Sequence, residues 1–331
     1  MKVYIPTYGA FAGKWIYDGY RNAWRAKGFS IVPDDETWAR IGDYEQQLLA
    51  AGEPLRNPTI IPRTPEKLSE DYMMMVVGGA TLANPDAFFK AAANSHKTFL
   101  FVQPHSFPAP WGEHSNFVSP VPDKIIKQVN SMDNIHLWAF SDSVQNSTFY
   151  SKWKNVHCIP LAFDSVGYNA VDNPKYNKFD ISFVGGWANN GFNEKRQIII
   201  ETFTAFKDSG LKCGFFVNKN LTHQQECDLL ANSKITLNIH DAYQRTLGHD
   251  TNERTFKSLG LNGALVSDSV GQLSRLFPDI KTSSDKQEMV GLVKQLLSLS
   301  ESELNDIKQK NKQDTLDNHC YTNRVEQLLK L

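Results

Sequence analysis

The sequence has few cysteines and no long apolar run. Its four cysteines are scattered, without a C-x-x-C pair: Cys158, Cys213, Cys227 and Cys320. This spacing argues against a structural zinc site and against a disulfide framework, and it favours a reducing compartment. No segment approaches the ~18 uninterrupted apolar residues of a transmembrane helix, so the sequence predicts no bilayer-spanning segment.

An excess of charge of one sign is missing as well. The 35 Lys and Arg residues nearly balance the 36 Asp and Glu residues, which leaves a formal net charge of −1. This balance does not attract the whole protein to nucleic acid or to an anionic membrane, although a local basic groove is still compatible with it. The chain starts MKVYIPTYG, without the charged leader and apolar stretch of a secretory signal. We therefore expect a cytoplasmic protein.

The length and the apolar pattern predict two α/β domains. A chain of 331 residues is about twice the usual length of one domain. Short apolar runs alternate with longer amphipathic stretches, which is typical of βαβ units and parallel sheets. Residues 164–178, DSVGYNAVDNPKYNK, are polar and contain a proline, which favours a linker. We predict two doubly wound, Rossmann-like domains, 1–163 and 179–331, that face a central cleft, with a final helix that can return to the first domain.

The pattern also predicts the individual elements. Strands are expected at Lys2–Pro6, Ser30–Val32, Thr59–Ile61, Tyr72–Val77, Thr98–Val102, Ile135–Ala139, Asp180–Val184, Leu211–Val217, Lys234–Ile239 and Ala264–Ser267. Helices are expected at Lys14–Lys27, Asp35–Ala51, Pro85–Ala93, Pro122–Asn130, Asp142–Lys152, Lys286–Leu297, Ser300–Lys312 and Thr322–Leu331. Residues 241–251 are expected to form a polar loop, and the chain beyond Asp279 to be almost wholly helical. Ligands of doubly wound folds bind outside the carboxyl ends of the strands, so candidate residues are sought there.

The first βα turn has the sequence TYGAFAGK, residues 7–14. Tyr8, Gly9 and Gly13 are candidates for a substrate loop, because glycines let the backbone approach a ligand at the N-terminus of the next helix. The spacing is not GxGxxG, so a dinucleotide fingerprint is not supported. A plain tight turn is the alternative.

Basic and aromatic residues are interleaved along the helix that follows. Aromatic rings can stack on bases or sugars while cations hold phosphates, which makes Lys14, Trp15 and Arg21 candidates for the acceptor side. An amphipathic helix with its aromatics in the core is the alternative. Asp18 is a candidate general base, or else a solvated surface carboxylate.

A second candidate base lies in the loop QPHSFPAPWGEH, residues 103–114. His105 comes immediately after a predicted strand, where functional residues concentrate, and an imidazole can accept a proton near neutral pH. A loop histidine without a role is the alternative.

The second half opens with the stretch ISFVGGWANNGFNEKR, residues 181–196, which reads as a strand, a glycine pair and a helix. Backbone amides at Gly185 and Gly186, together with the guanidinium of Arg196, would suit a diphosphate. Glycine pairs after strands also occur for steric reasons alone.

The clearest pattern runs from Ile235 to Asp268, as a strand ITLNIH, a polar loop, a helix start NERTFKSLGLNG and a strand ALVSD. Together with the closing segment HCYTNRVEQLL, residues 319–329, it resembles the carboxyl-terminal domain of GT-B glycosyltransferases of the spore-maturation-type and group 1 branch. The resemblance spans about residue 181 to the end. The matching positions are Asn238, His240, Asn252, Arg254, Phe256, Gly263, Ser267 and Asp268.

The resemblance implies a hexosyl- or pentosyltransferase that uses a nucleotide sugar, with UDP favoured, and that requires no metal or other cofactor. It implies these donor-binding residues: Gly185, Gly186, Arg196, His240, Asn252, Glu253 and Arg254. One position departs from the family, because Lys257 stands where a glutamate usually holds the donor ribose. A lysine cannot accept hydrogen bonds from hydroxyls, so either Glu253 takes over or the donor is gripped differently.

The sequence leaves the acceptor open. A hydroxymethylated base in phage-type DNA is the leading candidate, because some GT-B enzymes modify such bases and the basic, aromatic helix 14–27 would suit DNA. A cell-surface glycan or a protein is the alternative acceptor. The alternative of another class is a non-catalytic protein that binds a sugar or nucleotide, which would show binding without turnover.

Overall fold

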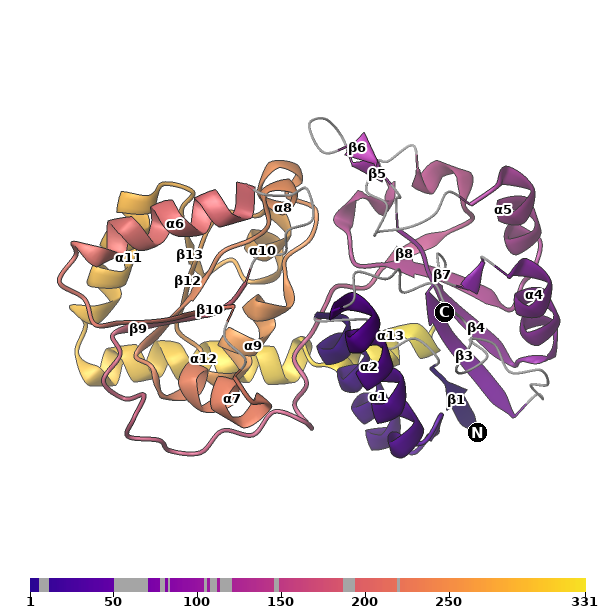
Figure 1. Cartoon of the computed structure of the whole chain (residues 1–331), viewed down its shortest axis with the longest axis horizontal. Coiled ribbons are helices and arrows are strands. Elements are labelled where there is room, and N and C mark those ends of the chain that lie inside the picture. Colours follow the sequence, from indigo (N-terminus) through magenta and orange to yellow (C-terminus); the bar gives the residue numbers. More distant parts are fainter. Residues whose placement is uncertain are drawn as a thin grey trace. The chain divides into compact units, whose positions relative to one another are not determined.

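The protein consists of two compact units, Met1–Pro160 with Arg324–Leu331, and Leu161–Asn323 (Figure 1). The computed structural model describes residues 1–5, 12–50, 71–77, 81–82, 84–103, 106–107, 112–113, 121–145, 149–186, 194–218 and 221–331. The chain enters the second unit after Pro160 and leaves it after Asn323, so its last residues belong to the first unit. Arg324 Nε donates to the carbonyl of Pro160 at 3.0 Å within that unit.

A six-stranded parallel sheet forms the first unit, in the order β2-β1-β3-β4-β7-β8. Its strands are β1 (Lys2–Tyr4), β2 (Ser30–Val32), β3 (Tyr72–Val77), β4 (Lys97–Phe101), β7 (Ile135–Ala139) and β8 (Val156–Cys158). The central strand β3 reads YMMMVV, an uninterrupted apolar run that is typical of a strand buried on both faces. A separate antiparallel pair joins β5 (Ser106–Phe107) to β6 (Gly112–Glu113).

The helices of the first unit lie between these strands in the chain. They are α1 (Ala12–Ala26), α2 (Asp35–Ala50), α4 (Pro85–Asn94) and α5 (Asp123–Asn130). The prediction of one helix over Asp142–Lys152 is wrong, because the structure has two short 3-10 turns, η1 (Asp142–Gln145) and η2 (Tyr150–Lys152). Serine side chains compete for the backbone here: the amide of Ser143 donates to Ser141 Oγ at 3.1 Å. The predicted strand Thr59–Ile61 lies outside the described residues.

A five-stranded parallel sheet forms the second unit, in the order β10-β9-β11-β12-β13. Its strands are β9 (Ile181–Gly185), β10 (Cys213–Val217), β11 (Ile235–Asn238), β12 (Leu265–Ser267) and β13 (Lys281–Thr282). The expectation that the chain beyond Asp279 is almost wholly helical did not include β13, because a strand of two residues shows no alternation. The strand order reverses between β9 and β11, and ligands of doubly wound sheets bind outside the carboxyl ends at such a reversal.

Eight helices of the described chain alternate with these strands or follow them. The last helix includes the boundary between the two units, after Asn323. The eight helices are α6 (Glu194–Lys207), α7 (His223–Asn232), α8 (Ala242–Leu247), α9 (Glu253–Leu261), α10 (Gly271–Leu276), α11 (Lys286–Leu297), α12 (Glu301–Asn318) and α13 (Tyr321–Leu329). Figure 1 shows α6 and α11 on one face of the second sheet and α7, α9 and α12 on the other. No helix in the described part of the chain has the length and apolar character needed to cross a membrane.

Helix α8 occupies residues that the pattern predicts to be a polar loop. The Gln244 side chain accepts a hydrogen bond from the amide of Asp241 at 3.2 Å, which fixes the first turn. Gly248, at φ 71°, ends the helix in the left-handed region that favours glycine. A helix of six residues has no apolar stripe long enough to detect, so its two ends are the only sequence signal for it.

Residues 164–178, expected to be a linker, lie within the second unit and are hydrogen-bonded to α7. The amide of Val171 donates to Asp228 Oδ1 at 3.1 Å, and Asn232 Nδ2 donates to the carbonyl of Val171 at 2.8 Å. The segment is polar because its backbone is satisfied by polar side chains of a helix, and polar composition alone does not distinguish this arrangement from a solvated linker.

Candidate functional site

Arg254 lies where two neighbouring strands of the second sheet end. It is the second residue of α9, and its Nε donates to the carbonyl of Val184 at 2.5 Å. Its Nη1 donates to Asn238 Oδ1 at 3.0 Å and to the carbonyl of Ile239 at 3.2 Å. One guanidinium therefore joins the carboxyl ends of β9 and β11, the two strands between which the sheet order reverses.

The surroundings of Arg254 hold a buried cation in place. Its guanidinium carbon lies 4.7 Å from the centre of the Phe183 ring, which gives a cation–π contact. Burial lowers the pKa of Arg254, and the carboxylates of Glu226, Asp241 and Glu253 act in the opposite direction. A guanidinium keeps its proton despite such a shift, so the site carries a permanent positive charge.

The two glycines at the end of β9 are closely packed against side chains. A Cβ on Gly185 would lie 2.3 Å from Nη2 of Arg254, and a Cβ on Gly186 would lie 2.1 Å from Oδ1 of Asn218. The steric explanation for this glycine pair therefore holds at both positions. It also ties Gly185 to the site, because only a residue without a side chain lets the guanidinium lie against the strand end.

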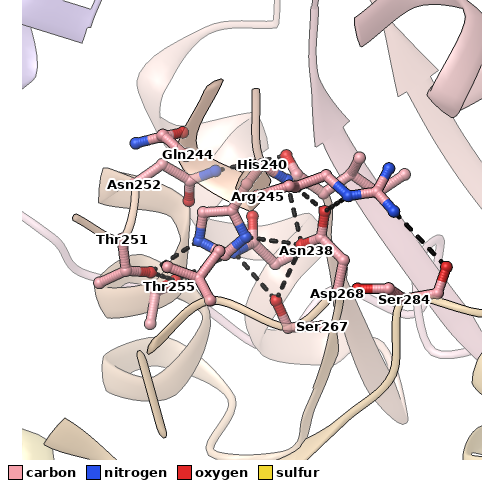
Figure 2. Close-up of polar contacts among 12 residues, drawn as sticks. Asn238, His240, Gln244, Arg245, Thr251, Asn252, Thr255, Ser267, Asp268 and Ser284 are labelled. Atoms are coloured by element: carbon pink, nitrogen blue, oxygen red, sulfur yellow. Dashed lines mark hydrogen bonds and ion pairs between the residues drawn. The ribbon is translucent and has the colours of Figure 1, made fainter. Parts of the chain in front are cut away.

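The side chain of His240 is enclosed within the second unit and is not exposed to a bound nucleotide sugar. Its side chain is fully buried; Nδ1 lies 2.6 Å from Asp268 Oδ1, and Nε2 lies 2.7 Å from Thr251 Oγ1 (Figure 2). Both ring nitrogens are therefore engaged within the chain. Burial alone would raise the pKa of Asp268, but His240 and Arg245 lower it below its ordinary value, so this carboxylate is ionised at neutral pH.

Lys257 is the centre of a cluster that we call the Lys257 cluster, formed with Glu226, Glu253 and Tyr168. Lys257 Nζ lies 2.7 Å from Glu226 Oε1 and 3.2 Å from Glu253 Oε1. Tyr168 donates to Glu253 Oε1 at 3.2 Å. The side chains of Lys257, Glu253 and Glu226 are 8%, 10% and 15% exposed, so these charges are largely removed from water.

The pKa directions in the Lys257 cluster follow from burial and charge. Burial raises the pKa of Glu253 above its ordinary value. It acts the same way on Glu226, but the neighbouring Lys257 ammonium outweighs it and lowers the pKa of Glu226. Burial would lower the pKa of Lys257, and the two carboxylates raise it instead. The lysine that departs from the family pattern therefore brings a second carboxylate, Glu226, to this place.

Two further residues that are predicted to bind the nucleotide sugar lie near the starts of helices. Asn252 precedes α9; its Nδ2 donates to the carbonyl of Ile239 at 3.3 Å, and its buried Oδ1 has no hydrogen-bond partner among the described residues. Arg196 is exposed in the first turn of α6, and residues 187–193 before it lie outside the described residues.

The pattern missed four polar residues of this region apart from those of the Lys257 cluster. They are Lys195, Arg245, Thr251 and Thr255. Lys195 Nζ lies 2.8 Å from Asp241 Oδ1, and Arg245 Nε lies 3.3 Å from Asp268 Oδ2. A signal existed for Thr251 and Thr255, because their spacing of four places them on one side of a helix start. The two cations carry no such signal, since a charge in a polar loop is common.

In the first unit, α1 turns most of its large residues inward. Tyr20 and Trp24 are fully buried, as the core-facing alternative predicts. Arg21 is also buried, donates to the carbonyl of Pro33 at 2.9 Å and pairs with Asp35 at 2.9 Å. These contacts give Arg21 a structural role in joining α1 to Pro33 and to the first residue of α2.

The remaining candidates of the first unit that the structure describes lie in α1. Asp18 Oδ1 accepts a hydrogen bond from Trp38 Nε1 at 2.6 Å. Lys14 Nζ lies 5.5 Å from the ring centre of Trp15, and both side chains are partly exposed. Gly13 is the second residue of α1, so it belongs to the helix. The other three candidates, Tyr8, Gly9 and His105, lie outside the described residues.

Part of the chain matches a known protein family. Residues 178–330 match the sequence model of the glycosyl transferase-like family. A search of curated proteins found no match to the chain. In the part of the chain that the structure describes, no three His, Cys, Asp or Glu side chains are grouped so as to hold a metal ion.

Three solved structures match the chain, two of them with a TM-score above 0.5. An α-glucosyltransferase in complex with UDP-glucose and DNA containing an abasic site matches with a TM-score of 0.53 and 12% identity, over 99% of this chain and 98% of that chain. T4 phage BGT in complex with its UDP-glucose substrate matches with a TM-score of 0.51 and 12% identity, over 100% of both chains. Against S. aureus TarM, with a TM-score of 0.49 and 13% identity, 79% of this chain covers 55% of the other.

The family match covers the segment that carries Gly185, Arg254 and three residues of the Lys257 cluster, all but Tyr168. The likeness in fold to the two complexes with UDP-glucose extends over nearly the whole chain. The prediction of two doubly wound, parallel-sheet domains is confirmed by the observed sheets. The chain is therefore a glycosyltransferase with the GT-B fold, and its residues 178–330 match the glycosyl transferase-like family.

Proposed function

We propose that this protein transfers a sugar from a UDP-sugar to the hydroxyl group of a hydroxymethylated base in duplex DNA. Binding of the UDP-sugar is supported by the position of Arg254 across the carboxyl ends of β9 and β11. The acceptor half is supported by the likeness, over nearly the full length of both chains, to an α-glucosyltransferase seen with UDP-glucose and DNA.

The chemistry requires stabilisation of the leaving group. When the bond between the sugar and the diphosphate breaks, negative charge develops on the phosphate oxygen. A preorganised cation beside backbone amides stabilises that charge, because it needs no reorganisation during the reaction. Arg254 is such a cation, and the backbone at Gly185 and Gly186 lies beside it. In this proposal the chain's own cations, rather than a metal ion, carry this stabilisation.

The ribose of the donor requires acceptors for its hydroxyl groups. We assign this role to the carboxylates of the Lys257 cluster, because a carboxylate accepts hydrogen bonds and a lysine does not. Lys257 holds Glu226 and Glu253 in one place. The missing family glutamate is thus replaced by two carboxylates and the ammonium that pairs with them.

Turnover with defined DNA tests the acceptor. The wild-type protein is incubated with UDP-glucose and a duplex containing hydroxymethylcytosine, and UDP release and glucosylated base are measured. We expect product with this duplex and none with the unmodified duplex. A gel shift at two salt concentrations checks contact with DNA, because phosphate contacts weaken as salt rises.

Other outcomes of this experiment separate the alternatives. Product with a soluble glycan but not with DNA would support the proposed donor and would show that the acceptor is a glycan. UDP-glucose binding without any UDP release, with every acceptor, would contradict the transferase reaction and would favour a binding protein.

Replacing Gly185 with alanine is expected to lower the affinity for UDP by roughly tenfold, the value of one hydrogen bond to a charged group. The added Cβ would lie 2.3 Å from Arg254 Nη2 and would displace the guanidinium from the strand end. Calorimetric titration with UDP measures the effect. Gly291→Ala on α11 is the matched control, since its Cβ meets nothing within 4 Å. Equal affinities in the two variants would contradict the placement of the donor.

A further inference from the structure

Six polar side chains form a buried network at the end of β11 (Figure 2). They are Asn238, His240, Thr251, Thr255, Ser267 and Asp268, and each is at most 2% exposed. Burial of this many polar groups costs free energy unless each one is hydrogen-bonded. The network cannot itself contact a substrate. It includes Asn238, however, whose Oδ1 holds Arg254 Nη1 at 3.0 Å.

Asp268 determines where the proton of His240 lies. Its carboxylate accepts from the backbone amide of His240 at 3.0 Å, and it pairs with Arg245 Nε at 3.3 Å and His240 Nδ1 at 2.6 Å. An ionised carboxylate only accepts hydrogen bonds, so the ring nitrogen that faces it must carry a proton. When Nδ1 carries the only ring proton, Nε2 is an acceptor.

The hydroxyl groups transmit this direction to Asn238. Thr251 Oγ1 lies 2.7 Å from His240 Nε2 and therefore donates its proton to it. Thr255 Oγ1 lies 2.7 Å from Thr251 Oγ1, which leaves it to donate to Thr251. Thr255 Oγ1 is then an acceptor for Asn238 Nδ2, at 3.0 Å. Each hydroxyl has one proton to give, so the whole chain runs one way.

The other end of the Asn238 amide agrees with this direction. Arg254 only donates, so the amide atom that faces it must be the oxygen, and the amide nitrogen must face the network. A proton on His240 Nε2 instead of Nδ1 would reverse the hydroxyls. Thr255 would then aim its proton at the amide nitrogen of Asn238, which would either keep only its longer contact with Ser267 Oγ, at 3.3 Å, or turn toward Arg254.

We propose that His240 and Asp268 are positioning residues for Arg254: through Thr251 and Thr255 they fix the Asn238 amide, whose oxygen sets the guanidinium across the ends of β9 and β11. The inference rests on the proposed function in that Arg254 binds the donor diphosphate. It assigns to His240 a role through other residues, which accounts for its complete burial.

A double-mutant cycle between Asp268→Asn and Arg254→Ala tests the inference. An asparagine at 268 keeps the shape but places an amide nitrogen among donors. In the otherwise wild-type protein we expect Asp268→Asn to lower UDP affinity and kcat/KM on the order of tenfold, as for coupled residues of one network. In the Arg254→Ala background we expect Asp268→Asn to change UDP affinity by less than about twofold. Equal factors in both backgrounds would overturn the inference, since a general structural defect acts independently of Arg254.

Thr255 provides a second test that does not depend on the folding of Asp268→Asn. Thr255→Val keeps the shape and removes the hydroxyl, whereas Thr255→Ser keeps the hydroxyl. We expect the kcat/KM of Thr255→Ser to be at least about fivefold higher than that of Thr255→Val. In the Arg254→Ala background, we expect the two substitutions to give the same UDP affinity. Equal activity of the two variants would overturn the inference. If the wild-type protein does not bind UDP, the proposed function itself is overturned. If it binds UDP but the effects of the substitutions are additive, the positioning role of His240 and Asp268 is overturned.

Discussion

Replacing Arg254 with alanine is expected to lower kcat for sugar transfer by about 10²–10³-fold, the loss typical of one preorganised charge-stabilising donor. The guanidinium lies at the carboxyl ends of β9 and β11, where we propose that the leaving diphosphate binds. Transfer assays with UDP-glucose at saturating concentration measure this loss in kcat.

Two other variants separate the charge from its geometry. Arg254→Lys keeps a positive charge but lacks the planar fork that meets Val184, Asn238 and Ile239 together. We expect it to fall between wild type and Arg254→Ala. Arg40→Ala, on the exposed side of α2, removes the same charge from the first unit and is expected to have no effect. Wild-type kcat in a folded Arg254→Ala protein would remove Arg254 from the site.

Replacing Lys257 with methionine is expected to lower the free energy of unfolding by about 3–5 kcal/mol, the cost of leaving buried charges without their partner. Glu226 and Glu253 both lie within 3.2 Å of Lys257 Nζ, and methionine fills a similar volume without a charge. Urea unfolding measures the loss. Adding Glu226→Gln to the methionine variant removes one uncompensated carboxylate and is expected to recover part of the stability. Strictly additive losses in the double variant would contradict the cluster.

The ion pair between Lys257 and Glu226 predicts how the stability difference between wild type and Lys257→Met depends on pH. Lys257 lowers the pKa of Glu226 in the folded protein, so the folded state binds fewer protons there than the unfolded state. The stability that Glu226 contributes is therefore present above its unfolded pKa of about 4.3 and is lost as the pH falls through its lower folded pKa. We expect the difference between wild type and Lys257→Met to be largest near pH 7 and to shrink below about pH 4. A constant difference over this range would contradict the assignment.

Much of the fold could be predicted because the evidence for it is local. Strands such as β3 and β9 are apolar runs between turn residues, and helices such as α11 have a stripe of apolar residues. Elements without such a pattern were missed or misjudged. Helix α8 is short and polar, and the serines near η1 take backbone hydrogen bonds that a helix would need.

The candidate site was predictable only where its residues are close in the chain. Gly185 and Arg254 each follow from a short motif, and Glu253 and Lys257 are four residues apart on one helix. Glu226 reaches Lys257 from a helix 31 residues earlier, and Tyr168 reaches Glu253 over 85 residues. No local pattern encodes such contacts, because they depend on how the elements pack.

His240 shows that a motif position does not reveal how its residue acts. The resemblance implies a residue that binds the donor, and nothing in the sequence indicates that the side chain is buried. The contacts with Asp268 and Thr251 arise only when β11, β12 and the start of α9 come together. A buried imidazole with both nitrogens engaged can influence the donor only through its neighbours.

A crystal structure of the protein with bound UDP would show whether Arg254 binds the diphosphate of the donor. We predict that the diphosphate lies at the carboxyl ends of β9 and β11, with a phosphate oxygen within about 3 Å of an Arg254 nitrogen, beside the backbone of Gly185 and Gly186. A UDP molecule bound elsewhere, with its diphosphate out of reach of Arg254, would contradict the account.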